Sequence, residues 1–217
     1  MEIKGKIKAL PPKNITEEAK LYINKLLTSL DDLYYHQYEH TLDVYERSTY
    51  LAKKEGLNDE DREMIGLAAL FHDTGFVVRY DENEIIGAKI AENFLKTMLY
   101  SDEKIKEIER IILATNPNYK EPKDIFEAII KDADIDNLGR DDFFEKGGKV
   151  KTEIETIKSI KIKDPEWHHA MLDVLYKNKF FTKTQKEERE QKREENIEHL
   201  KTKISIDDLK KNLDDDK

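Results

Sequence analysis

The chain has 217 residues, of which 38% are hydrophobic and 39% are charged, and its net charge is −9. This length predicts one domain with a substantial core, and the acidic balance argues against broad binding to nucleic acid or anionic membranes. Eight glycines and five prolines are too few for a turn-rich all-β fold, so we expect an all-α protein.

The sequence also predicts the cellular compartment of the protein. There is no cysteine, which excludes disulfides and zinc fingers and suits a reducing cytoplasm. The first residues lack the apolar segment of a signal peptide, and no apolar run approaches 18 residues. We therefore expect a cytoplasmic protein without a membrane span, and the sequence leaves a homo-oligomer open.

Three segments are expected along the chain. Residues 1–15 form an N-terminal arm, residues 16–182 form one helical bundle, and residues 183–217 form a charged C-terminal helical extension. In the extension, large apolar side chains are sparse up to residue 203, which predicts a solvated helix. Ser205 is expected to cap a last short helix.

Apolar residues recur at helical spacing through the bundle. Thr16 is a candidate N-cap for the first helix, in which Leu21 is expected to be buried. A second helix covers about residues 36–55, and Asn58 can cap the third. The third helix is apolar on more than one face, so we expect it to be central and buried.

Five further helical segments follow in the bundle. The first starts near residue 84, the second is capped by Ser101, and the third opens at Pro122. The fourth covers residues 141–162 with an expected interruption at Gly147-Gly148, and the fifth opens at Asp164-Pro165.

Histidines and aspartates that could bind a metal ion or transfer protons lie at the ends of the apolar helices. The third helix ends in His72-Asp73, and an ionised Asp73 there is costly unless it is paired or bound to metal. His36 and His40 are four residues apart and share a helix face. Asp132 and Asp134 end another apolar segment, and either could complete a metal site. Imidazole and carboxylate together suit Mn²⁺, Fe²⁺, Ni²⁺ or Zn²⁺, with Mg²⁺ as an alternative.

The set of motifs resembles the HD superfamily of metal-dependent phosphohydrolases. The segments that carry the resemblance are Tyr35-His36-Gln37-Tyr38-Glu39-His40, His72-Asp73-Thr74-Gly75 and Asp132-Ala133-Asp134, within about residues 34–139. The first segment is also similar to the corresponding part of cyclic-nucleotide phosphodiesterases.

The resemblance implies a role for each of these residues. His40, His72, Asp73 and the later aspartate would bind one divalent ion, with Asp73 also part of the catalytic centre. The family's Ala-Asp dipeptide favours Asp134 as the last ligand. Asp132 would then contact the ligands without binding the ion itself, or would only end the helix. His36 would be the catalytic proton donor.

One departure concerns the number of metal ions. Two-metal members of the family carry further histidines between the His-Asp pair and the last aspartate, whereas this chain has Asn83 and Asn116 near those places. This favours one ion over two. It also counts against an oxygenase on the same fold, which would need two irons.

The expected function is metal-dependent hydrolysis of a nucleotide-like phosphodiester or phosphomonoester, a small anionic substrate. Arg79 and Arg140 follow the motifs and are the candidates for phosphate contact. The alternative is a catalytically silent sensor or scaffold that binds metal or nucleotide on the same fold, because a motif alone does not establish activity.

Overall fold

Helices make up the regular structure of the described part of the chain, which confirms the all-α prediction. The computed structural model describes the backbone of residues 14–215 and the side chains of residues 14–206. This part contains nine α-helices, two short 3₁₀ helices and no strand. In chain order the elements are α1 (Ile15–Leu27), α2 (Tyr38–Lys54), α3 (Asp59–Phe71), η1 (Thr74–Val77), α4 (Asn83–Thr97), α5 (Asp102–Leu113), α6 (Ile125–Asp134), η2 (Asp136–Gly139), α7 (Phe143–Lys158), α8 (Asp164–Lys177) and α9 (Lys183–Asp215).

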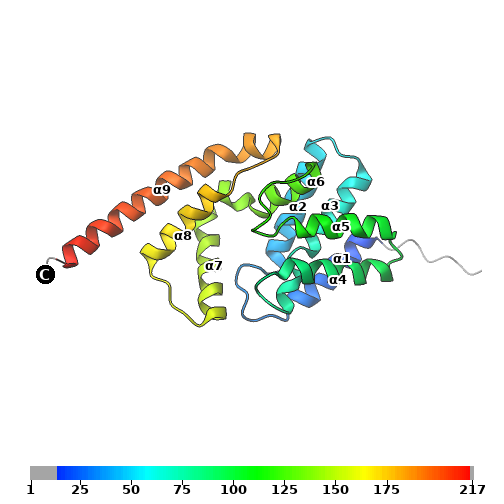
Figure 1. Ribbon diagram of the computed structural model, residues 1–217, viewed down its shortest axis with the longest axis horizontal. Coiled ribbons are helices and arrows are strands. Elements are labelled where there is room, and N and C mark those ends of the chain that lie inside the picture. Colours follow the sequence, from blue (N-terminus) through cyan, green and yellow to red (C-terminus); the bar gives the residue numbers. More distant parts are fainter. Residues whose placement is uncertain (1–13, 216–217) are drawn as a thin grey trace, which may run out of the picture.

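Helix α3 is the centre of the larger part of the molecule. All its residues from Met64 to Phe71 are buried, as expected for a helix that is apolar on several faces. Helices α1, α2, α5 and α6 pack against it, and α4 packs against η1 and α5 (Figure 1). The end of α3, which carries His72-Asp73, therefore lies inside the bundle.

Helices α7–α9 lie to one side of this bundle (Figure 1). They share a second apolar cluster, which includes Phe143, Met171, Leu175, Phe180 and Leu200. Helix α9 runs along α8 and then projects beyond it (Figure 1). The charged extension thus uses its few apolar residues to hold the three helices together.

The first helix differs in detail from the expectation. Its N-cap is Asn14, whose Oδ1 accepts hydrogen bonds from the backbone N–H groups of Thr16 (3.1 Å) and Glu17 (3.4 Å). Thr16 therefore lies inside the first turn, because a stronger capping side chain precedes it. Leu21 is exposed, and Ile23 and Leu27 are the buried residues. Of the expected N-terminal arm, residues 1–13 lie outside the described residues.

Two expected interruptions in the later helices are wrong. Helix α7 continues through Gly147-Gly148, and α9 continues through Ser205. A Cβ atom on Gly147 would collide with the side chain of Met171 on α8. This glycine therefore allows two helices to approach closely and does not end one. Among the described residues, no helix combines the length and the apolar character needed to cross a bilayer.

Candidate metal centre

His72 lies immediately after α3, against the core. It is fully buried, and its Nδ1 lies 2.7 Å from the carbonyl oxygen of Ala69, one turn earlier. This hydrogen bond places the proton on Nδ1 and leaves Nε2 free to donate an electron pair. A backbone carbonyl on the other ring nitrogen is a common second partner of metal-binding histidines.

Two other helices bring His40 and Asp134 to His72. Nε2 of His40 and Nε2 of His72 each lie 3.4 Å from Oδ1 of Asp134. The same two nitrogens lie 3.3 Å and 3.0 Å from Oδ2 of Asp73. One ligand atom from each of His40, His72 and Asp134 falls within 4.8 Å of the others, which is a group that could hold a metal ion.

The cluster contains buried polar atoms without a hydrogen-bond partner. Within the described residues they are Nε2 of His40, Nε2 of His72, Oδ2 of Asp73 and Oδ1 of Asn83. Buried polar atoms are nearly always hydrogen-bonded, so several orphans in one place indicate a missing bonding partner. Imidazole nitrogens and carboxylate oxygens are ligands for a divalent transition-metal ion. The residues therefore fit such an ion.

The electrostatics of the cluster support the same conclusion. Burial lowers the pKa of His40, but Asp134 and Asp73 outweigh burial and raise it. Burial also opposes protonation of His72, yet Asp73 and Asp134 raise its pKa well above 6.5. Burial raises the pKa of both carboxyl groups, but the adjacent imidazoles hold them well below their usual range. The two carboxylates thus favour a positive charge on the imidazoles of His40 and His72. A bound metal cation can supply this positive charge in place of the imidazole protons.

Helix α4 supports Asp73 from the side. Nδ2 of Asn83, the first residue of α4, donates to Oδ1 of Asp73 at 3.4 Å. The approach is close: a Cβ atom on Gly87 would lie 2.9 Å from the carbonyl oxygen of His72, and one on Gly75 would collide with the backbone of Asn83. The two glycines thus allow α4 to lie directly against the His-Asp turn.

His36 lies in the loop before α2, which begins at Tyr38, so the expectation that His36 and His40 share a helix face is wrong. A carboxylate from α7 holds His36 in place. Glu153 has no exposed surface, and its Oε1 contacts Nδ1 of His36. Its Oε2 accepts the backbone N–H groups of Tyr34 and Tyr35 at 2.9 Å and that of His36 at 3.1 Å. Oε1 also accepts a hydrogen bond from Oη of Tyr80 at 3.1 Å. Glu153 therefore fixes both the loop and the imidazole.

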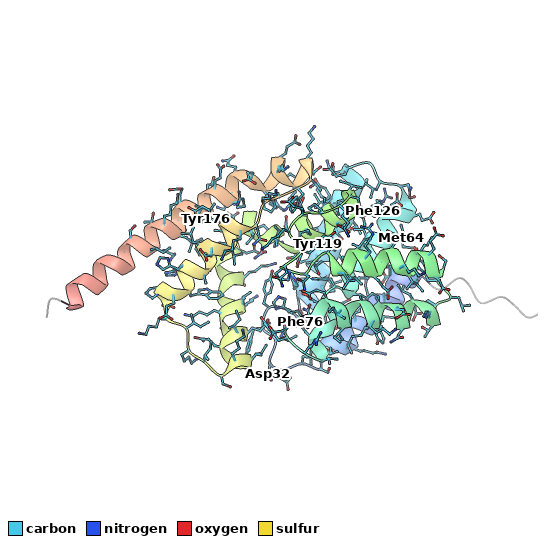
Figure 2. All side chains as sticks on the ribbon, viewed as in Figure 1. Asp32, Met64, Phe76, Tyr119, Phe126 and Tyr176 are labelled. Atoms are coloured by element: carbon cyan, nitrogen blue, oxygen red, sulfur yellow. The ribbon has the colours of Figure 1, made fainter. Side chains whose placement is uncertain are left out.

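The His36 ring lies next to the cluster of His40, His72, Asp73 and Asp134, the candidate metal site. Its centroid lies 5.6 Å from that of His40, and the ring of Phe76 covers it at 4.5 Å. Phe76, which follows the His-Asp turn on η1, is labelled in Figure 2. The imidazole is thus oriented at Nδ1 by Glu153 and covered by Phe76, beside the cluster.

A pocket of about 310 Å³ opens beside His40. Tyr34 and Tyr35 line it from the loop before α2, and Lys146 and Lys149 line it from α7. The volume lies at the lower end of the range for small-molecule sites. Because His40 belongs to both the cluster and the pocket wall, a molecule in the pocket would lie next to the cluster.

Asp132 does not point at the cluster. Its two oxygens accept the backbone N–H groups of Phe181 (2.8 Å) and Thr182 (2.7 Å), just before α9. Burial raises the pKa of Asp132 to about 6, although these hydrogen bonds act in the opposite direction. The structure thus places Asp134 with the histidines and Asp132 at the start of α9.

The two candidate phosphate-binding arginines lie differently. Arg79 is exposed and pairs with Glu82 at 3.1 Å. Arg140 contacts both oxygens of Asp43 at 2.9 and 3.0 Å and makes a two-point contact with Asp142. Neither guanidinium lines the pocket beside His40.

Sequence reasoning missed the contribution of α7. Glu153, Lys146 and Lys149 all come from a segment whose charged residues are typical of a solvated helix face. A signal exists in the spacing, because positions 146, 149 and 153 share one face of a helix. Nothing in the sequence shows, however, that this face turns toward His36.

Comparisons with known proteins agree with this fold. Residues 37–136 match the family model described as the HD domain. No curated protein sequence matches the chain. Three solved structures, each under 25% identical in sequence, share the fold.

Bacillus subtilis YpgQ in complex with ADP has a TM-score of 0.63 and 17% identity, covering 88% of this chain and 94% of its own. Lin1889 from Listeria innocua has a TM-score of 0.61 and 22% identity, covering 91% and 99%. An HD-superfamily hydrolase from Bacillus thuringiensis has a TM-score of 0.58 and 19% identity, covering 90% and 99%.

In this helical bundle two histidines and two aspartates meet in a cluster that could hold a metal ion. The matched segment contains all four of these residues. Residues 37–136 of the chain form an HD domain.

Proposed function

We propose that the protein is a metal-dependent phosphohydrolase that acts on a nucleotide-like phosphodiester or phosphomonoester. The observation that carries the proposal is the meeting of the unpartnered Nε2 atoms of His40 and His72 with the carboxylates of Asp73 and Asp134. We assign these four residues as ligands of one divalent ion. When bound, such an ion activates water and screens the charge of a phosphate.

His36 is assigned as the proton donor to the leaving oxygen. Its ring lies beside His40, and Glu153 contacts its Nδ1. A carboxylate on Nδ1 orients an imidazole and fixes which nitrogen can transfer a proton. Histidine suits the role because its ordinary pKa lies near neutral pH.

Two observations support a nucleotide as the substrate. One structure of similar fold, that of YpgQ, holds ADP. In this chain the pocket beside His40 combines tyrosine and lysine side chains, which suit a nucleoside and a phosphate. The net charge of −9 argues against a nucleic-acid substrate, and the lack of cysteine suits a cytoplasmic location.

The test is hydrolysis of a panel of chromogenic phosphodiesters and phosphomonoesters by chelator-stripped protein with Mn²⁺, Ni²⁺ or Mg²⁺ added. We expect metal-dependent turnover in the wild type and none in His72→Ala. Full activity of His72→Ala would contradict the proposal. Nucleotide binding without product, from protein shown to hold metal, would favour a sensor over an enzyme.

A further inference from the structure

Helix α7 lies outside the segment that matches the HD domain, yet one of its faces reaches the site. We propose that Lys146 and Lys149 bind the anionic groups of the substrate that extend beyond the attacked phosphate. This inference rests on the proposed function and names the substrate class: a phosphoester that carries a second phosphate next to the first. The two lysines would then determine specificity.

The position of the pocket supports this role. Lys146 and Lys149 line the same pocket as His40, and His40 is in the cluster that forms the candidate metal site. A phosphate at the cluster would therefore place its neighbouring phosphate in the pocket. The lysines are the positively charged side chains of the pocket wall, so an anion in the pocket has these two groups as its partners.

Lys146 can change partners at low cost. Its side chain is only 16% exposed, and its Nζ contacts Asp43. Arg140 contacts both oxygens of Asp43 as well, at 2.9 and 3.0 Å. If Lys146 turns to a ligand, Asp43 keeps a cationic partner and no buried charge is left alone.

Lys149 is still more readily available. Its partner is Glu145 at 3.1 Å, and the side chains are 51% and 70% exposed. Exposed ion pairs of this kind contribute little to stability. Lys149 can therefore leave Glu145 for a phosphate without a measurable loss of folding.

The pocket also contains two carboxylates, Glu39 and Asp43. Asp43 contacts Lys146, whereas the partner of Lys149 is Glu145, which is outside the pocket wall. Replacing both lysines would leave two carboxylates and no lysine in the pocket wall, and only Asp43 would keep a cationic partner, Arg140. The loss of anion binding should therefore be larger than the loss of two neutral contacts.

The experiment measures the dissociation constants of AMP and ADP by calorimetry, each supplied as a phosphonate analogue that resists hydrolysis, with full-length protein and the same saturating Mn²⁺ concentration throughout. The proteins are the wild type, Lys146→Gln, Lys149→Gln, the double variant and Lys158→Gln. Lys158 is an exposed residue at the end of the same helix, outside the pocket, and serves as the control.

We expect the wild type and Lys158→Gln to bind ADP about tenfold or more tightly than AMP, the difference a charge-assisted hydrogen bond can give. The double variant should lose this preference and keep its affinity for AMP. Equal binding of AMP and ADP by the wild type would overturn the inference, as would an unchanged preference in the double variant. Lys149→Gln alone, which breaks only an exposed pair, should lower the preference if the fold is intact.

The hydrolysis panel separates this inference from the proposed function. If the protein binds ADP through the two lysines but hydrolyses nothing, the inference stands and the function is wrong. If it hydrolyses phosphoesters but shows no dependence on the lysines, the function stands and the inference is wrong.

Discussion

The carboxylate of Glu153 contacts Nδ1 of His36 across 117 residues of sequence. It comes from α7, outside the segment that matches the HD domain, and it also accepts three backbone N–H groups of the loop that carries His36. One buried side chain therefore joins the second cluster of helices to the proposed proton donor.

Glu153→Gln should lower the turnover number while metal affinity stays the same. The amide would offer Nδ1 of His36 an N–H group in place of a carboxylate oxygen, or lose backbone contacts. We expect a fall on the order of 10- to 100-fold, within the usual contribution of a general acid. Steady-state kinetics with calorimetric metal titration will check this. A change in metal affinity alone would show that Glu153 has a different role.

The contribution of Glu153 to stability should depend on pH. Burial would raise its pKa, but contact with His36 and the backbone N–H groups outweighs burial and lowers it below 4.5. A carboxyl with a lowered folded-state pKa stabilises the fold above pH 4.5, and this stabilisation is lost as pH falls through the folded-state pKa. The unfolding free energies of the wild type and Glu153→Gln should thus differ most above pH 4.5 and converge below it. Denaturant titrations from pH 3 to 7 will measure the difference, and a constant difference would contradict the assignment.

Gly87→Ala should destabilise the fold by about 1–3 kcal/mol, the usual cost of overpacking. Its Cβ would lie 2.9 Å from the carbonyl oxygen of His72, so metal affinity should fall as well. Gly148→Ala is the matched control, since its Cβ would meet nothing within 4 Å. In a helix interior that change should stabilise the protein by roughly 0.5–1 kcal/mol. Thermal unfolding of Gly87→Ala and Gly148→Ala, with and without Mn²⁺, will measure both effects. Equal changes in stability for the two variants would contradict the close approach of α4 to the His-Asp turn.

Metal affinity should increase with pH through the neutral range. The pKa values of His40 and His72 are raised, after burial is outweighed by Asp73 and Asp134, so protons compete with the ion for Nε2 above pH 6.5. The logarithm of the affinity should rise by up to about one unit per pH unit for each proton displaced. Calorimetry in buffers of different ionisation enthalpy counts the protons released. Affinity that does not change between pH 6 and 8 would contradict the predicted competition.

The sequence predicts the bundle well because its signals are local. The all-round apolar character of α3 predicts its central place, and the helix-end positions of His72 and Asp134 predict where the cluster lies. Helix geometry predicts that Asp132 and Asp134 point in different directions, but the choice of Asp134 as the ligand rests on the resemblance to the HD superfamily.

Other features depend on contacts between distant segments and leave no local signal. The burial of Glu153 against His36 requires α7 to fold back over the loop before α2. The unbroken course of α7 through Gly147 depends on Met171 of α8, so a glycine pair that favours a break in isolation serves helix packing instead. The pocket lysines are visible in the sequence only as part of a charged helix.

The most direct test compares Asp134→Asn with Asp132→Asn. Bound Mn²⁺ and Mn²⁺-dependent phosphoester turnover would be measured for both variants and the wild type. The assignment predicts that Asp134→Asn loses metal affinity by more than about 100-fold, beyond the range for residues that only support a ligand, and loses turnover with it. Asp132→Asn, which alters the contact before α9, should keep its metal and its activity. Metal binding and turnover that persist in Asp134→Asn, or turnover in the wild type without any metal, would contradict the account.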